Sequence, residues 1–191
     1  MIKTTLALCL AVSTSAFAQT ALPADLPHGT TTATVGVCFR PNDSAGCVQH
    51  IVAAINSAKT EIRVQAYNFT TIAILSALAD AKKRGVDVEV ILDKTNAPAS
   101  GAQGRYTGAT YMVNSDVPTY IDRKPQIAHN KLIIIDQHLV VGGSYNYSNN
   151  AEAHNAENVT FMDSPISAKW FLDNWYTRRS ISEVFKKPIV Q

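Results

Sequence analysis

One stretch of the sequence, residues 129–158, carries side chains whose types and spacing suit chemistry. His129 and Lys131 stand two positions apart at the start of a short apolar run rich in β-branched residues. Such a run is typical of a buried strand, and residues two apart on a strand point to the same side. An imidazole can act as a nucleophile or a general acid and base near neutral pH, and a neighbouring ammonium can hold an anion such as phosphate. The pair therefore favours phosphoryl transfer without a metal ion.

A second group of polar side chains follows the apolar run. Asp136 ends the run, and Gly143, Ser144 and Asn146 form a segment typical of a turn. The spacing is His-x-Lys, four residues, Asp, six residues and Gly-Ser-x-Asn, all within residues 129–146. This pattern resembles the signature of the phospholipase D superfamily.

The resemblance extends from about Val35 to the C-terminus. A short chain with one copy of the pattern is most similar to the secreted bacterial endonucleases of the superfamily, which act as dimers and need no divalent metal. The resemblance therefore implies a phosphodiesterase that cleaves nucleic acid without a cofactor. It also implies that His129 attacks phosphorus to form a phosphohistidine, while Lys131, Ser144 and Asn146 hold the non-bridging oxygens.

Two carboxylates complete the expected catalytic set. The family places a carboxylate after the pattern, and Glu157 fits that place, where it would orient His129 through the second ring nitrogen. Asp136 is grouped with the catalytic residues in a structural or supporting role. No metal site is expected, because His154 and Glu157 would share a helical face but no third ligand is apparent.

A single His-x-Lys pair supplies a nucleophile but no general acid for the leaving oxygen. A covalent mechanism needs a second residue to protonate the leaving oxygen and later to activate water. None of the other four of the five histidines is followed by a lysine two positions later. We therefore expect a two-fold homodimer that brings two His129 side chains together at its interface.

The pattern leaves the substrate open, because nucleic acids and phospholipids both contain a phosphate diester. A lipid phosphodiesterase with the same groups is the main alternative, although no amphipathic membrane helix is apparent. A non-catalytic nucleic-acid-binding dimer is a further one. The net charge of +2, or +1 without Lys3, argues against a protein that coats DNA tightly, but a local basic groove is sufficient for a nuclease.

The N-terminus has the features of a secretory signal peptide. Lys3 precedes a short apolar segment, and Ala16-Phe17-Ala18 is a small-x-small cleavage site, so residues 1–18 are expected to be removed. Residues 19–32 are expected to form a flexible leader and residues 33–191 a single catalytic domain. A periplasmic or secreted protein without stable membrane association follows. In that compartment Cys38 and Cys47 are expected to form a disulfide.

Hydrophobic spacing and turn residues predict the order of elements. The predicted strands and helices alternate, which indicates an α/β fold with a mixed, largely parallel sheet flanked by helices on both faces. Active groups in such sheets gather beyond the carboxyl ends of the strands, where Asn68, Phe69, Asp93 and Lys94 are placed. A hairpin is expected across Asp136-Gln137. The predicted strands are 33–39, 61–67, 86–92, 117–120, 132–135, 138–142 and 157–162, and the predicted helices are 45–58, 71–84, 110–114 and 165–183.

Overall fold

The computed structural model describes residues 22–23, 25–97 and 107–186. The chain divides into two units, residues 1–30 and residues 31–191. In the first unit the predicted signal peptide, residues 1–18, lies outside the described residues. The described part of the predicted leader contains no helix or strand, and the N–H of Gly29 donates to the carbonyl of Leu26 in a turn.

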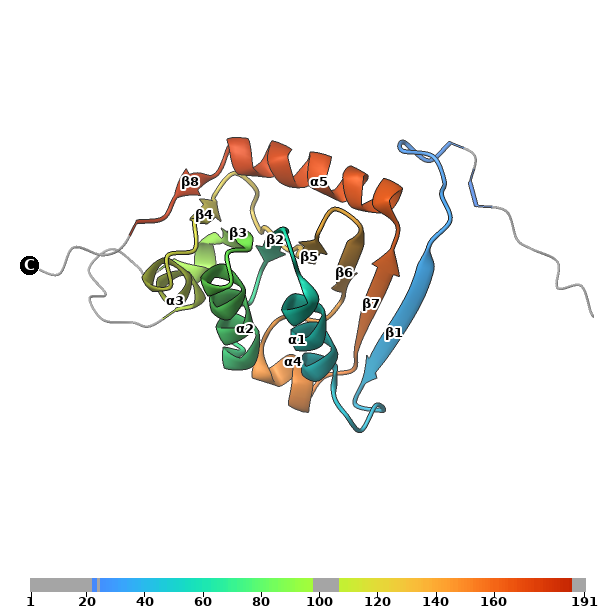
Figure 1. The fold of residues 1–191 in the computed structure, drawn as a ribbon, viewed down its shortest axis with the longest axis horizontal. Coiled ribbons are helices and arrows are strands. Elements are labelled where there is room, and N and C mark those ends of the chain that lie inside the picture. Colours follow the sequence, from blue (N-terminus) through green and yellow to red (C-terminus); the bar gives the residue numbers. More distant parts are fainter. Residues whose placement is uncertain (1–21, 24, 98–106, 187–191) are drawn as a thin grey trace, which may run out of the picture. The chain divides into compact units, whose positions relative to one another are not determined.

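The second unit is built on an eight-stranded sheet with the order β1-β7-β6-β5-β2-β3-β4-β8 (Figure 1). The predicted α/β class, with a mixed sheet and helices on both faces, is confirmed. The strands are β1 (Thr34–Arg40), β2 (Glu61–Ala66), β3 (Asp87–Asp93), β4 (Thr119–Asp122), β5 (Lys131–Ile135), β6 (Leu139–Gly143), β7 (Glu157–Asp163) and β8 (Glu183–Val184).

The expectation that the sheet is largely parallel is wrong. Among the strand pairs of the described residues, only β2–β3 and β3–β4 are parallel, and the other five neighbouring pairs are antiparallel. The tight turn at Asp136-Gln137 reverses the chain between β5 and β6, with positive φ angles of 51° and 62°. A parallel pair needs a long crossover connection, and α2 supplies one between β2 and β3. The first strand, β1, pairs with β7 at the far edge instead of lying beside β2.

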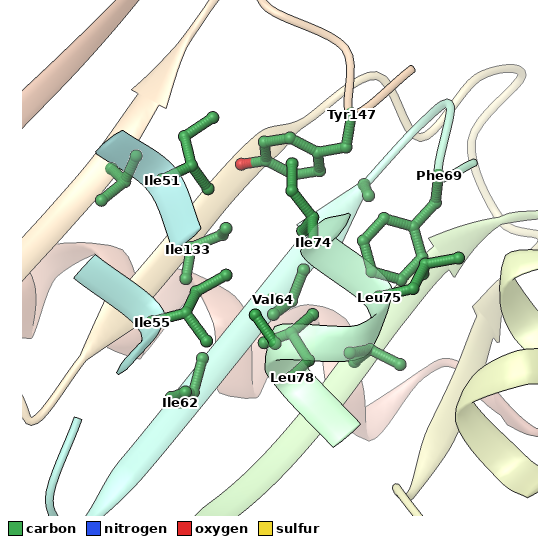
Figure 2. Packing of buried hydrophobic residues seen from close by; sticks show 14 of the residues in the cluster. Ile51, Ile55, Ile62, Val64, Phe69, Ile74, Leu75, Leu78, Ile133 and Tyr147 are labelled. Atoms are coloured by element: carbon green, nitrogen blue, oxygen red, sulfur yellow. The ribbon is translucent and has the colours of Figure 1, made fainter. Parts of the chain in front are cut away.

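The helices cover both faces of the sheet (Figure 1). They are α1 (Cys47–Ser57), α2 (Ile72–Lys83), the 3-10 turn η1 (Lys94–Asn96), α3 (Gly108–Asn114), α4 (Asn149–Ala153) and α5 (Pro165–Ser180). The main core lies between the sheet and α1–α4, where Ile51, Ile62, Leu78 and Ile133 are fully buried (Figure 2). Burial of each such side chain stabilises the fold by about 1.5–3 kcal/mol.

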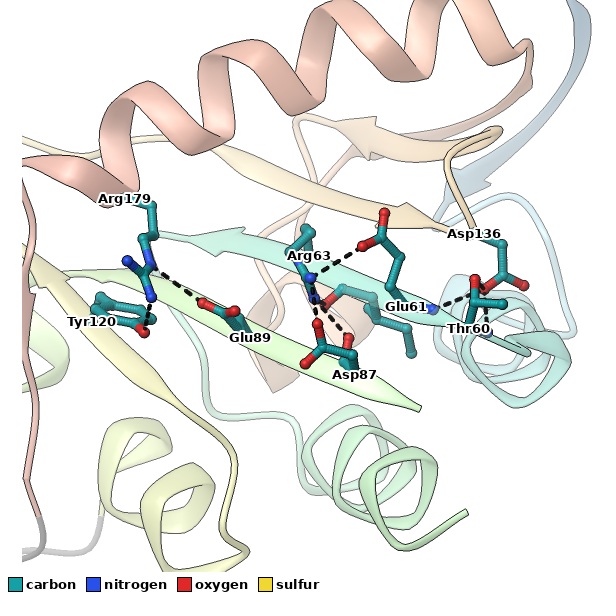
Figure 3. Close-up of polar contacts among 9 residues, drawn as sticks. Thr60, Glu61, Arg63, Asp87, Glu89, Tyr120, Asp136 and Arg179 are labelled. Atoms are coloured by element: carbon teal, nitrogen blue, oxygen red, sulfur yellow. Dashed lines mark hydrogen bonds and ion pairs between the residues drawn. The ribbon is translucent and has the colours of Figure 1, made fainter. Parts of the chain in front are cut away.

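Among the described helices, only α5 covers the opposite face of the sheet. Trp175 is fully buried there, and its ring nitrogen donates to the carbonyl of Val64 at 3.0 Å. Polar pairs fasten this face as well: Arg63 binds Asp87 and Glu61, and Arg179 binds Glu89 and the hydroxyl of Tyr120 (Figure 3). The contacts of Trp175 and Arg179 hold α5 across β2, β3 and β4. At the other edge of the sheet, Val35, Val37 and Phe39 of β1 are exposed.

The predicted disulfide joins Cys38 of β1 to Cys47 of α1, with an S–S distance of 2.03 Å. Both residues are buried in the main core. The bond therefore attaches the edge strand β1 to the helix that packs beneath the sheet. No helix among the described residues is long and apolar enough to cross a membrane.

Candidate active site

Except for Asp136, the predicted site residues lie at the end of the sheet where β2 and β3 end and β5 begins. Lys131 pairs with Ala66, the last residue of β2, because β5 runs antiparallel to β2. His129 is exposed two residues before that pair, and Lys131 is half-buried. The site thus forms beyond the carboxyl ends of the parallel strands, as expected for this type of sheet.

His129 and Lys131 contact each other and a third residue, Tyr67. The ammonium of Lys131 donates to the carbonyl of His129 at 2.7 Å. The imidazole of His129 lies with its centroid 4.8 Å from the ring centroid of Tyr67, and the Lys131 Nζ is 5.6 Å from the same ring. Burial lowers the pKa of Lys131, and the negative charge of Glu157 opposes that shift in part.

The turn after β6 is shaped by Gly143. Its φ is 152°, and a Cβ at this position would lie 2.3 Å from the carbonyl oxygen of Asn158. A larger residue is therefore excluded by both the backbone conformation and the space. The close approach brings Ser144 to the start of β7, where its hydroxyl accepts from the N–H of Asn158 at 3.1 Å.

Asn146 follows on the same turn. Its side-chain oxygen is buried and has no hydrogen-bond partner among the described residues. A buried amide oxygen without a partner costs free energy, and a ligand that supplies a donor would recover it. The turn is tied to the segment after β2, because the carbonyl of Tyr147 accepts from the N–H groups of Thr70 and Thr71 at 2.8 and 2.9 Å.

Glu157 has different partners from those expected. Its carboxylate accepts from the hydroxyl of Ser144 at 2.5 Å and from the side-chain amide of Asn155 at 2.9 Å. The ring that adjoins His129 belongs to Tyr67. In this structure the carboxylate of Glu157 therefore positions Ser144, and its charge acts on Lys131.

Asp136 lies at the opposite end of β5 from Lys131, which fits the structural or supporting role expected for it. Its carboxylate accepts from the N–H groups of Lys59, Thr60 and Glu61 at 2.8, 2.8 and 3.0 Å and from the hydroxyl of Thr60 at 2.8 Å (Figure 3). It thereby holds the loop between α1 and β2 against the hairpin. The supporting role expected for Asp136 is structural, because the five-residue strand β5 separates it from the chemistry.

Asp93 is a positioning residue that sequence reasoning placed at a strand end without a further role. Its buried carboxylate accepts from the N–H of Thr95 at 2.9 Å and from the N–H of Ala128 at 2.7 Å. Burial alone would raise the pKa of Asp93, but these hydrogen bonds and the charge of Lys94 outweigh it and hold the pKa below its usual range. Asp93 therefore fixes the residue directly before His129 to the end of β3.

An apolar hollow of about 250 Å³ adjoins the site on the α5 face. It lies beside Lys131 and is bounded by β5, β6 and β7 and by one residue of α5. Its lining residues are Asn130, Lys131, Leu132, Val140, Gly142, Gly143, Thr160, Met162 and Phe171. Among the described residues, no group of three or more His, Cys, Asp or Glu side chains could hold a metal ion.

The arrangement defines a class of site. A solvent-accessible imidazole lies beside an ammonium, and a turn carrying hydroxyl and amide groups adjoins them at the carboxyl edge of a mixed sheet. Such groups bind a phosphate diester and offer a nitrogen nucleophile to phosphorus.

Comparison with known proteins gives the family. Residues 51–177 match the family described as "Cardiolipin synthase, PLD-like domain". A phospholipase D from Rickettsia prowazekii is 36% identical over 148 residues, which cover 78% of this chain and 69% of the relative. The chain therefore belongs to the phospholipase D superfamily, and it is a phosphodiesterase of that superfamily.

Solved structures agree with this assignment. The phospholipase D family member Nuc from Salmonella typhimurium superposes with a TM-score of 0.72 at 35% identity, covering 82% of this chain and 100% of that chain. NucT from Helicobacter pylori shares the fold with a TM-score of 0.68 at 20% identity, covering 81% of this chain and 100% of that chain.

Proposed function

We propose that the protein is a metal-independent endonuclease that hydrolyses phosphodiester bonds of nucleic acid without sequence preference. The observation that carries the proposal is the open end of the strands, where His129 is exposed beside Lys131 and the hydroxyl of Ser144 donates to Glu157. An exposed site at an edge can accept one phosphate from the middle of a long polymer. An enclosed pocket would admit only a polymer end.

The proposed reaction has two displacements at phosphorus. His129 attacks, a P–N bond forms, and the P–O bond to the leaving strand breaks while a general acid protonates the leaving oxygen. Water then attacks the phosphohistidine, the P–N bond breaks, and the free phosphate end is released. Lys131 and Asn146 neutralise or hold the non-bridging oxygens, whose charge otherwise repels the nucleophile.

Cationic side chains near the site support a polyanionic substrate. Lys94 follows β3, and its Nζ donates to the carbonyl of Pro125 at 3.3 Å. Arg123 and Lys124 are exposed on the segment that contains Pro125, a few residues before His129. Arg123 also pairs with Glu183 at 3.0 Å. Cations along this approach would contact the phosphates that flank the scissile one.

The general acid comes from a second copy of the protein, so the active unit is a homodimer. The sequence offers one His-x-Lys pair, and a two-fold axis beside it would bring the second His129 to the leaving oxygen. An uncovered apolar surface supports this arrangement. Val35, Val37 and Phe39 of β1 are about half exposed on the face opposite Cys38, and the apolar hollow beside Lys131 continues that face.

The shared site can be tested with mixed dimers. We expect a dimer of one wild-type subunit and one His129→Asn subunit to lose most activity, because each reaction needs both imidazoles. Two differently tagged subunits, co-expressed and purified through both tags, supply the mixed species. If this species keeps half the wild-type rate, the sites act independently and the shared-site proposal fails.

Export from the cytoplasm is part of the proposal. The N-terminal segment has the order of a cleavable signal peptide, and the bond between Cys38 and Cys47 is of a kind that persists in oxidising compartments. N-terminal sequencing of the protein from a periplasmic extract or culture medium should begin at Gln19. A protein that retains Met1 in the membrane fraction would contradict export by cleavage.

A lipid phosphodiesterase is the second candidate, and one observation favours it. The Rickettsia prowazekii relative at 36% identity is named phospholipase D. The apolar hollow beside Lys131 could accept part of an acyl group if it is not covered by a second copy. The two substrates therefore have to be compared directly.

The deciding experiment is cleavage of supercoiled plasmid by the mature protein in excess EDTA, with His129→Ala as the control. Phosphatidylcholine vesicles are assayed with the same preparations. Plasmid cleavage by wild type alone supports the proposal and assigns the chemistry to His129. Cleavage only after magnesium is added would contradict the metal-independent mechanism, and turnover of lipid without plasmid would favour the second candidate.

A further inference from the structure

Tyr67 lies directly after β2 and contacts both members of the catalytic pair. Its ring is tilted by 60° against the imidazole of His129, with 4.8 Å between the centroids. The ammonium of Lys131 lies 5.6 Å from the centre of the same ring, within the range of a cation–π contact. One aromatic ring therefore touches the proposed nucleophile and the proposed phosphate ligand.

The backbone of Tyr67 is held independently of its ring. The side-chain amide of Asn96 in η1 donates to the carbonyl of Tyr67 at 2.5 Å and to the carbonyl of Asp93 at 3.1 Å. Asn96 is buried, and Asp93 in turn binds the N–H of Ala128. The end of β3 thus fixes both the residue that carries the ring and the segment that carries His129.

The sequence predicts that the carboxylate of Glu157 orients His129, and in the structure the ring of Tyr67 is the group that lies against the imidazole. Glu157 itself accepts hydrogen bonds from Ser144 and Asn155. An exposed histidine on a loop has two free side-chain torsions, and packing against a half-buried ring restricts them. Restricting the nucleophile near its attack geometry raises the rate of the chemical step more than it raises affinity for the substrate.

We propose that Tyr67 is a positioning residue, whose ring holds the imidazole of His129 and the ammonium of Lys131 in the arrangement that reacts with phosphorus. The inference rests on the proposed phosphodiester chemistry at His129. It does not depend on whether the natural substrate is nucleic acid or lipid. The ring of Tyr67, and not its hydroxyl, positions the two side chains.

The test compares Tyr67→Phe, which keeps the ring, with Tyr67→Leu, which removes it. Tyr176→Leu is the matched control, because Tyr176 is an exposed tyrosine on α5 that also packs edge-on against an aromatic ring, that of Trp175. Turnover is measured with bis(p-nitrophenyl) phosphate in EDTA, since this diester reports the chemistry without a polymer or a membrane. The imidazole C–H signals of His129, assigned from a His129→Asn variant, are recorded by NMR for each protein.

We expect Tyr67→Phe and Tyr176→Leu to keep kcat within about threefold, and Tyr67→Leu to lose about 10- to 100-fold in kcat with a much smaller change in KM. The His129 signals should move in Tyr67→Leu, because the ring current of Tyr67 is lost, and should stay in place in Tyr176→Leu. Unchanged His129 signals and unchanged kcat in Tyr67→Leu would overturn the proposal. A loss of kcat that Tyr67→Phe shares equally would overturn the role of the ring.

The experiment distinguishes failure of the nuclease proposal from failure of the Tyr67 proposal. If wild type turns over the small diester but does not cut plasmid, the nuclease proposal fails and the Tyr67 comparison still holds. If wild type turns over no diester, the His129 signals still report whether the ring contacts the imidazole. Signals that do not move on loss of the ring would then overturn the contact itself.

Discussion

The hydroxyl of Ser144 donates a hydrogen bond to the carboxylate of Glu157 across the turn between β6 and β7, with 2.5 Å between the two oxygens. A serine hydroxyl carries one proton, so Ser144 cannot donate to a phosphate oxygen while it is bound to Glu157. The same carboxylate acts electrostatically on Lys131. Glu157 therefore acts on Lys131, which is proposed to hold the phosphate, and it takes up the proton that Ser144 would need for the same role.

Glu157→Gln should change the pH dependence of the reaction. The charge of Glu157 raises the pKa of Lys131 against the lowering effect of burial, so its removal should lower that pKa further. Because the ammonium form binds phosphate, the alkaline limb of the kcat profile should move to lower pH. Profiles of kcat against pH for wild type and variant, on the small diester, measure this shift.

Lys131→Arg is the control for attributing the alkaline limb of the kcat profile to Lys131. Arginine stays charged throughout the accessible pH range, so the residual activity of this variant should lack the alkaline limb. An alkaline limb that persists unchanged in Lys131→Arg would show that another group causes it.

Asp136→Asn should lower stability and leave catalysis intact. The carboxylate caps three backbone N–H groups between Lys59 and Glu61, and its loss should cost about 1–3 kcal/mol of unfolding free energy at neutral pH. The value of kcat should change little, since Asp136 lies at the opposite end of β5 from Lys131. Urea unfolding and diester turnover measure the two quantities, and a large loss of kcat in a stably folded variant would restore Asp136 to the catalytic set.

The same substitution predicts a dependence of stability on pH. Burial would raise the pKa of Asp136, but the hydrogen bonds from Thr60, Glu61 and Lys59 lower it overall. A carboxylate with a lowered pKa contributes stability above its unfolded pKa of about 3.9, and loses it as the pH falls through the folded value. The difference between wild type and Asp136→Asn should therefore shrink below about pH 4.

Asp93→Ala should reduce activity through the segment that it holds. Without the bond from Ala128, the residue before His129 loses its anchor, and displacement of the nucleophile should cost about 10- to 100-fold in kcat. Asp122→Asn is a matched control, because Asp122 is the register partner of Asp93 on β4, is similarly buried, and binds Arg178 of α5. Equal losses of kcat in both variants, measured on the small diester, would mean that the effect of Asp93 is general destabilisation.

Local sequence patterns predicted the elements of the fold well. The expected helices 45–58 and 71–84 correspond to α1 and α2, and the hairpin at Asp136-Gln137 is present. Apolar periodicity and turn residues act over a few positions, so such elements can be recognised from a short window. The pairing of β1 with β7 could not be recognised in this way, since the two strands are far apart in the sequence and no helical crossover specifies their order.

The site shows the same division between local and distant information. The spacing from His129 to Asn146 grouped His129 and Lys131 with the turn that follows β6, but Asp136 of the same pattern lies at the opposite end of β5. The contact of Glu157 with Ser144 depends on the pairing of β6 with β7, and the contact of Tyr67 with His129 depends on where β2 ends in space. No local pattern encodes either arrangement. Arg178 and Arg179 bind Asp122 and Glu89, which are 56 and 90 positions away in sequence, so no local pattern could predict these pairs.

Removal of the disulfide should destabilise the protein without altering its chemistry. The bond between Cys38 and Cys47 closes a loop with a sequence separation of 9, and the lost entropy of the unfolded state gives it a contribution of about 2–3 kcal/mol to the unfolding free energy. The double variant Cys38→Ser and Cys47→Ser should lose this amount in urea unfolding.

Wild type treated with a thiol reductant should match the double variant, because both lack the link between β1 and α1. Turnover of the small diester at a temperature where the variant stays folded should remain within about twofold, as expected for changes away from a site. A reduced wild type as stable as the oxidised one would show that the pairing of β1 with β7 and the core contacts of α1 hold this edge of the sheet without the covalent bond.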